Sequence, residues 1–152
     1  MRSFAFSGHL IEVSDILDTR SPEEAMSEIM SKVGFGSSDY GGSFKDFEKD
    51  FMRSVTPKTT VIVLGDARTN GRTPAEDLFA KVAQRANRTF WLNPEPRLYW
   101  NYGDSVMSSY EPFCDGAFEC WQTEHLENFV DIVATGRVDL RTGPAQTSRH
   151  RY

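Results

Sequence analysis

Cysteine is scarce in this chain of 152 residues, which contains only Cys114 and Cys120. Their C-x5-C spacing is not a common zinc or redox spacing, and no second pair exists to complete a metal site. The three histidines lie far apart in the sequence, so they do not indicate a metal cluster either. We therefore expect two partly buried, free thiols in a cytoplasmic protein.

Long apolar runs and an excess of positive charge are also missing. No run approaches the roughly 18–20 apolar residues that span a bilayer. The formal net charge is -5, whereas nucleic-acid binding requires clustered Lys and Arg. The hydrophobic share of 39% and the charged share of 26% indicate an ordinary globular domain. We expect neither a membrane nor a nucleic acid as a partner.

Signatures of common catalytic sites are absent as well. The sequence has no GxSxG nucleophile elbow and no GxxxxGK[ST] phosphate loop. The pair Gly34-x-Gly36 follows an expected helix rather than a strand, so it is not a dinucleotide fingerprint. These absences favour a protein that is not an enzyme.

Apolar spacing predicts strands that alternate with helices. The expected strands are 3–7, 10–13, 59–64, 89–92 and 118–121. The expected helices begin at Pro22 after the cap residue Ser21, near Gly42, at Pro74 after Thr73, and at Thr123. This order implies an α/β fold with a Rossmann-like, mostly parallel sheet flanked by helices. We place the domain at residues 1–134 and a flexible tail at residues 135–152.

The run Val61–Asp66 predicts a strand covered on both faces that ends in a carboxylate. Ligands of such folds bind at the carboxyl ends of the strands. Asp66 is therefore either a cap for its own loop or a ligand of a hard cation such as Mg²⁺. Ser38 and Asp39 offer further oxygens from a hydroxyl-rich loop. Asp39 or Ser43 could instead simply cap the following helix.

A second polar and aromatic stretch, residues 91–110, is rich in Trp and Tyr. Such residues dominate the energetics of protein interfaces, so the stretch could form a partner surface. Alternatively, it is a long loop held over the core by its rings. The sequence leaves both interpretations open.

Three motifs stand out: SDYGGSF at 38–44, VIVLGDARTN at 61–70 and WLNPEPRLYWNYGDS at 91–105. In order and spacing they resemble a von Willebrand factor A domain of the CoxE-like type. The resemblance covers about residues 3–134 and corresponds to the C-terminal two-thirds of such a domain.

The resemblance implies a metal-ion-dependent adhesion site. In this family the site consists of a DxSxS motif after a central first strand, a Thr or Ser from a second loop, and a later Asp. By motif, Ser38 corresponds to the second-loop hydroxyl and Asp66 to the later Asp. The chain contains no DxSxS motif, so we expect an incomplete domain that binds Mg²⁺ weakly or not at all in isolation.

The resemblance also implies partners. Such domains usually work beside a MoxR-type AAA+ ATPase, and the pair matures or remodels a client protein or complex. The main hypothesis is therefore a non-enzymatic protein-interaction module. The alternatives are a metal-dependent, hydrolase-like enzyme that uses Asp66 and Asp39, or an inert truncated fragment.

Overall fold

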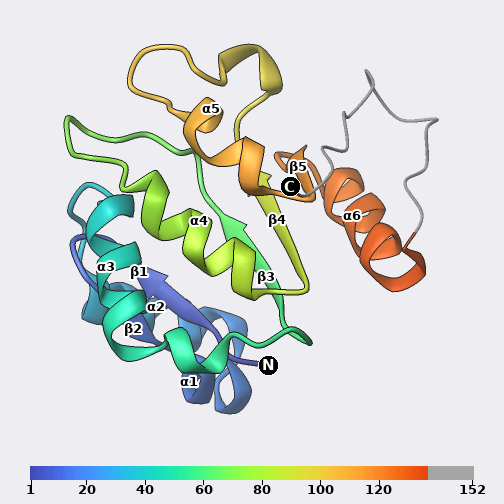
Figure 1. Cartoon of the computed structure of the whole chain (residues 1–152). Coiled ribbons are helices and arrows are strands. Elements are labelled where there is room, and N and C mark those ends of the chain that lie inside the picture. Colours follow the sequence, from blue (N-terminus) through green and yellow to red (C-terminus); the bar gives the residue numbers. More distant parts are fainter. Residues whose placement is uncertain (137–152) are drawn as a thin grey trace.

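A computed structural model describes residues 1–136 of the chain (Figure 1). The strands are β1 (Phe4–Phe6), β2 (Leu10–Glu12), β3 (Thr60–Leu64), β4 (Arg88–Asn93) and β5 (Gly116–Glu119). The α-helices are α1 (Ser14–Thr19), α2 (Pro22–Val33), α3 (Tyr40–Asp50), α4 (Glu76–Arg85), α5 (Met107–Tyr110) and α6 (Thr123–Thr135). Short 3-10 turns occupy Met52–Ser54, Arg97–Tyr99 and Glu111–Phe113. The predicted tail lies outside the described residues from position 137 onward, so it stays a prediction.

The strands form two separate groups. β1 and β2 are an antiparallel hairpin, whereas β3, β4 and β5 form a parallel sheet in that order. Parallel neighbours need crossover connections, and α4 supplies the one between β3 and β4. The predicted α/β fold with a parallel sheet flanked by helices is confirmed.

Helices cover both faces of the strands. α3 and α4 contact each other and lie on one face (Figure 1). On the other face α1 and α2 pack against the hairpin through a cluster that includes Val13, Ile16 and Ala25. At the far side of the sheet, Phe129 of α6 packs on Phe90 and Phe118 of β4 and β5.

Local signals fix two helix starts as expected. Ser21 and Glu24 form a reciprocal capping box at the start of α2, with Pro22 in the first turn. Asp39 caps α3 by accepting a hydrogen bond from the Gly42 amide at 2.9 Å. The capping interpretation of Asp39 is therefore confirmed.

The predicted cap at Thr73 is wrong, because α4 begins only at Glu76, after Ala75 in a left-handed conformation with φ 51°. The backbone before α4 makes a tertiary contact instead, since the Tyr110 hydroxyl donates a hydrogen bond to the Pro74 carbonyl at 2.8 Å. The prediction also missed the short helices α1 and α5, and placed β5 two residues too late.

The prediction that β3 is covered on both faces is also wrong. Ile62 is 42% exposed and Leu64 is 65% exposed. Within the described residues β3 is an edge strand of its sheet, and these two side chains lie largely open to solvent. Val61 and Val63, on the opposite face, do pack against the core.

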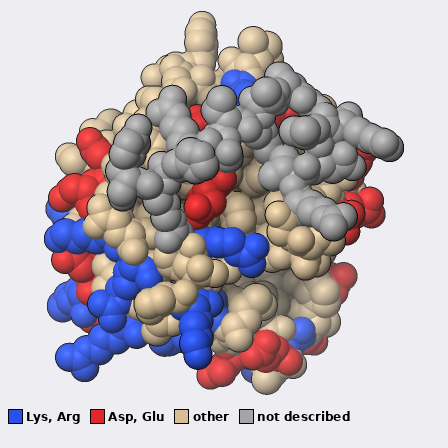
Figure 2. All heavy atoms as spheres, turned by 45° about the vertical axis from the view of Figure 1, so that its right-hand side comes forward, with Lys and Arg blue, Asp and Glu red and all other residues tan. Residues whose placement is uncertain are grey.

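No helix of the described residues is long and apolar enough to cross a membrane. Charge is unevenly distributed over the surface. On the face shown in Figure 2, Lys and Arg side chains gather at the lower left, and Asp and Glu side chains lie at the margins and near the centre. Although the net charge of the chain is -5, basic side chains therefore cluster locally on this face.

Candidate functional site

The turn after β3 places Asp66 at the carboxyl edge of the parallel sheet. One carboxylate oxygen, Oδ1, accepts hydrogen bonds from the Arg68 amide at 2.9 Å and the Tyr40 hydroxyl at 3.2 Å. A Cβ at position 65 would overlap the same hydroxyl, so Gly65 is required for this close approach. Asp66 thus caps its own loop, as one of the two sequence interpretations predicts.

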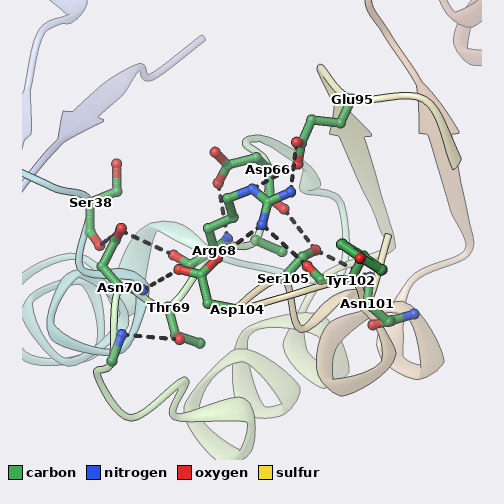
Figure 3. A network of polar contacts seen from close by, with 12 residues as sticks. Ser38, Asp66, Arg68, Thr69, Asn70, Glu95, Asn101, Tyr102, Asp104 and Ser105 are labelled. Atoms are coloured by element: carbon green, nitrogen blue, oxygen red, sulfur yellow. Dashed lines mark hydrogen bonds and ion pairs between the residues drawn. The ribbon is translucent and has the colours of Figure 1, made fainter. Parts of the chain in front are cut away.

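Arg68 ties the loop after β3 to two other loops (Figure 3). Its guanidinium makes a bidentate pair with Glu95, with hydrogen bonds of 2.8 and 3.1 Å. Its Nη1 also donates to Asp104 at 2.9 Å and to the Tyr102 carbonyl at 3.2 Å. These acceptors, Glu95 first and Asp104 second, raise the pKa of Arg68 above its ordinary value. Charge-assisted, two-pronged pairs of this kind fix loop geometry.

Asp104 pairs with Arg68 as a second acid, and we call Arg68, Glu95 and Asp104 the Arg68 clamp. Its Oδ2 accepts from the Asn70 amide at 3.0 Å, while its carbonyl accepts from the Thr69 amide at 3.0 Å. The Arg68 hydrogen bond and then the Asn70 amide lower the pKa of Asp104. The loop can therefore hold Ala67 at φ 59° and Asn70 at φ 51°, both in the left-handed region.

Ser38 and Asp66 lie along the same cavity, as the family resemblance implies. The cavity has a volume of about 470 Å³, and both residues line it. In Figure 3 the Ser38 hydroxyl and the Asp66 carboxylate point to the same open side. The Asn70 side-chain amide holds the Ser38 backbone in place by donating to its carbonyl at 3.1 Å. The structure thus brings both predicted residues to one edge without direct contact.

The two residues alone do not fit a complete Mg²⁺ site. Mg²⁺ requires near-octahedral oxygen coordination, and Ser38 with Asp66 supplies at most a hydroxyl and one carboxylate oxygen not already engaged by the loop. Asp39 does not join them, because its carboxylate caps α3. Among residues 1–136, no three His, Cys, Asp or Glu side chains converge on one point.

The aromatic stretch divides into a buried part and an exposed part. Trp91, Trp100 and Tyr110 are buried, and Trp91 stacks on Tyr110 with ring centroids 4.7 Å apart. Tyr102 is 74% exposed and Tyr99 is 50% exposed. The interpretation of a loop held over the core by its rings is confirmed for Trp91, Trp100 and Tyr110. The partner surface stays a prediction, for which Tyr99 and Tyr102 are the exposed candidates.

Sequence reasoning missed the roles of Arg68, Glu95 and Asp104. A signal was present, because all three lie within the two longer motifs. An arginine in one motif and two acids in the other are typical of loops that pair. The two cysteines are free thiols as predicted, and burial raises the pKa of Cys114 to about 12.

The match to a known family covers most of the chain. The family described as "VWA domain containing CoxE-like protein" matches residues 1–129. The chain belongs to this CoxE-like VWA family. No curated protein and no solved structure matches it.

Because the chain is a VWA domain, the Arg68 clamp can be located relative to the residues of the predicted adhesion site. The clamp joins loops at the carboxyl ends of β3 and β4, beside the predicted adhesion-site residues Ser38 and Asp66. It positions the Asp66 loop in this CoxE-like chain without itself supplying an oxygen that faces the cavity.

Proposed function

We propose that this CoxE-like VWA domain is a non-enzymatic, cytoplasmic protein-interaction module that assists a MoxR-type AAA+ ATPase in maturing or remodelling a client protein. The observation that carries this proposal is an exposed aromatic patch on a rigid loop. Leu98, Tyr99 and Tyr102 are 83%, 50% and 74% exposed. Exposed Tyr side chains on a fixed backbone are typical anchors of protein interfaces.

Rigidity of the patch follows from the clamp. The Tyr102 carbonyl accepts from Arg68, and Glu95 and Asp104 hold the same guanidinium. A preorganised loop loses less conformational entropy when it binds a partner. The edge that carries Asp66 therefore presents a fixed surface for a protein partner.

A binding experiment with the MoxR-type ATPase from the same genome tests the proposal. We expect complex formation by titration calorimetry, with Tyr102→Ala weakening the affinity about tenfold or more. Trp121→Ala is the matched control, because Trp121 is 50% exposed but lies outside the clamped loop. Equal affinity for the wild type and Tyr102→Ala would remove the patch from the interface. No complex at all would refute the partnership.

We propose further that Ser38 and Asp66 bind Mg²⁺ weakly or not at all in the isolated chain. Two protein oxygens leave most of the coordination shell to water. Calorimetric titration with MgCl₂ is expected to show no affinity in the micromolar range for the wild type or Asp66→Asn. Micromolar binding that Asp66→Asn abolishes and Asp131→Asn leaves intact would overturn this proposal.

A further inference from the structure

α3 and α4 lie side by side, and each carries a row of basic residues on its exposed side. Lys45 and Lys49 are one turn apart on α3, and Lys81 and Arg85 are one turn apart on α4. All four residues are exposed. The 3-10 turn that follows α3 adds the exposed Arg53. We call these five residues the basic surface.

A groove lies between the two helices, beside the basic surface. It has a volume of about 410 Å³, and its lining comes from α3, the turn after it and α4: Glu48, Met52, Lys81, Gln84 and Arg85. The Arg85 Nε donates a hydrogen bond to the Val55 carbonyl at 2.5 Å, which fixes the guanidinium at the end of the groove. Because this bond uses only the Nε–H, the two terminal nitrogens of Arg85 keep their donors for a further acceptor.

Carboxylates do not balance the basic surface. Lys81 pairs with Glu48 at 3.5 Å, and within residues 1–136 the other four members of the surface make no ion pair. On α2, by contrast, the same one-turn spacing joins opposite charges, since Lys32 pairs with Glu28 at 3.7 Å. A chain with a net charge of -5 therefore leaves several cations without counter-charges on one pair of helices.

Helix stability explains this arrangement only in part. Lys49 and Arg85 lie in the last turns of their helices, where a positive charge interacts favourably with the helix dipole. Lys45 and Lys81 lie in mid-helix, beyond the reach of this effect, and each is one turn from another cation. Like charges at this spacing destabilise a helix slightly. A partner of opposite charge would offset that loss.

The composition of the basic surface favours a protein partner over a nucleic acid or a membrane. Nucleic-acid bases stack on exposed aromatic rings, and peripheral helices insert exposed apolar side chains into lipid. Neither α3 nor α4 carries an exposed large hydrophobic residue. The net charge of -5 also opposes the approach of a long polyanion or an anionic bilayer. A short acidic segment can contact the five cations without meeting the acidic remainder of the chain.

We propose that the basic surface of α3 and α4 binds a short acidic segment of a partner protein. The surface is remote from the Asp66 edge, because Tyr40 in the first turn of α3 contacts Asp66, whereas Lys49 lies in the last turn. A helix of 11 residues is about 16 Å long. A partner can therefore occupy the basic surface while the Asp66 edge is engaged, and the proposal does not depend on the ATPase partnership.

The test uses the full chain and a fluorescein-labelled peptide of alternating Glu and Ser, about eight residues long. We expect saturable binding by fluorescence anisotropy at about 0.15 M salt, and weaker binding as the salt concentration rises. The same peptide with Gln in place of Glu is expected to bind about tenfold more weakly or worse. In ¹⁵N-labelled protein, we expect the amide shifts that the acidic peptide causes to fall within residues 45–53 and 81–85.

One variant separates binding from stability. Lys45→Glu is expected to weaken peptide binding about fivefold. It should leave the thermal midpoint unchanged or raise it, because the new carboxylate lies one turn before Lys49. Lys32→Glu is the matched control, an exposed lysine of α2 whose reversal should leave peptide binding unchanged.

Three results would overturn the proposal. The first is no binding of the acidic peptide at about 0.15 M salt, and the second is an equal effect of Lys45→Glu and Lys32→Glu. The third comes from two comparison probes, a single-stranded oligothymidylate and vesicles that contain phosphatidylserine. Tighter binding of either probe than of the peptide, weakened by Lys45→Glu, would assign the basic surface to a nucleic acid or to a membrane instead.

Discussion

β3 and β4 are neighbours in register, yet their environments differ sharply. Five consecutive residues of β4, Thr89–Asn93, are buried, whereas β3 has no buried residue in Thr60–Leu64. By composition the order would be reversed, because β3 reads TVIVL and β4 reads RTFWLN. Among the strands of residues 1–136, β4 has a hydrogen-bonded neighbour on each side, and β3 has a neighbour on one side.

The comparison shows that the burial of β3 and β4 depends on which elements flank each strand rather than on how hydrophobic its side chains are. α6 covers Phe90 and Leu92 through Phe129, and its cover does not reach their register partners Ile62 and Leu64. A strand as apolar as β3 normally has both faces and both edges covered. Within the described residues β3 departs from this pattern, because one of its edges is unpaired and Ile62 and Leu64 are exposed.

Leu92→Ala tests the buried strand, β4, and should produce the largest loss of stability among these variants. Leu92 is 2% exposed in the cluster with Phe118 and Phe129. We expect the free energy of unfolding to fall by about 2–5 kcal/mol, because a cavity forms in a packed core. Urea denaturation measures this effect. The control Leu92→Ile should cost less than about 1.5 kcal/mol, and an equal cost for both variants would argue against tight packing at this position.

Arg68→Gln tests whether the clamp, rather than burial, orders the end of β3. The variant loses the bidentate pair with Glu95 and the pair with Asp104. We expect a loss of about 1–2 kcal/mol, since the hydrogen bonds are charge-assisted but partly exposed to solvent. Urea denaturation at low and high salt measures it. Arg72→Gln is the control, because the Arg72 guanidinium donates to the Ser37 carbonyl rather than to a carboxylate. Equal losses for the two variants would refute a special role for the clamp.

Lowering the pH should weaken the same clamp by protonating Asp104. The Arg68 hydrogen bond and then the Asn70 amide hold the pKa of Asp104 below its ordinary value of 3.8. Folding therefore favours the ionised carboxylate, so its contribution is present above the ordinary pKa and is lost as the pH falls through the lowered value. We expect Asp104→Asn to reduce stability at neutral pH and to flatten the acid decline. Asp131→Asn is the control. If Asp104→Asn left the loss of stability at low pH unchanged, that loss would have to come from other carboxylates.

Much of the fold could be predicted from local signals. The capping box at Ser21, the apolar face of α6 and the parallel sheet all follow from spacing and cap chemistry. The start of α4 could not be predicted, because Pro74 and Ala75 are held by tertiary contacts rather than by a local cap. A local pattern cannot indicate contacts that a distant helix such as α5 makes.

The candidate site was predictable only in part. Motif comparison placed Ser38 and Asp66 at one edge, and the cavity does contain both. The Arg68 clamp depends on the spacing of three loops in space, so sequence alone could not pair Arg68 with Glu95 rather than with another acid. The exposure of Leu64 was unpredictable for a related reason, since it depends on which elements flank the strand.

Leu64→Ala tests the exposed strand, β3, and should have the smallest effect on stability among these variants. Leu64 is the register partner of Leu92 but is 65% exposed. Truncating it removes little buried surface, so the free energy of unfolding should change by less than about 0.5 kcal/mol. Urea denaturation of the isolated chain, beside Leu92→Ala, gives the contrast directly. A loss comparable to that of Leu92→Ala would mean that the Leu64 side chain is covered in solution.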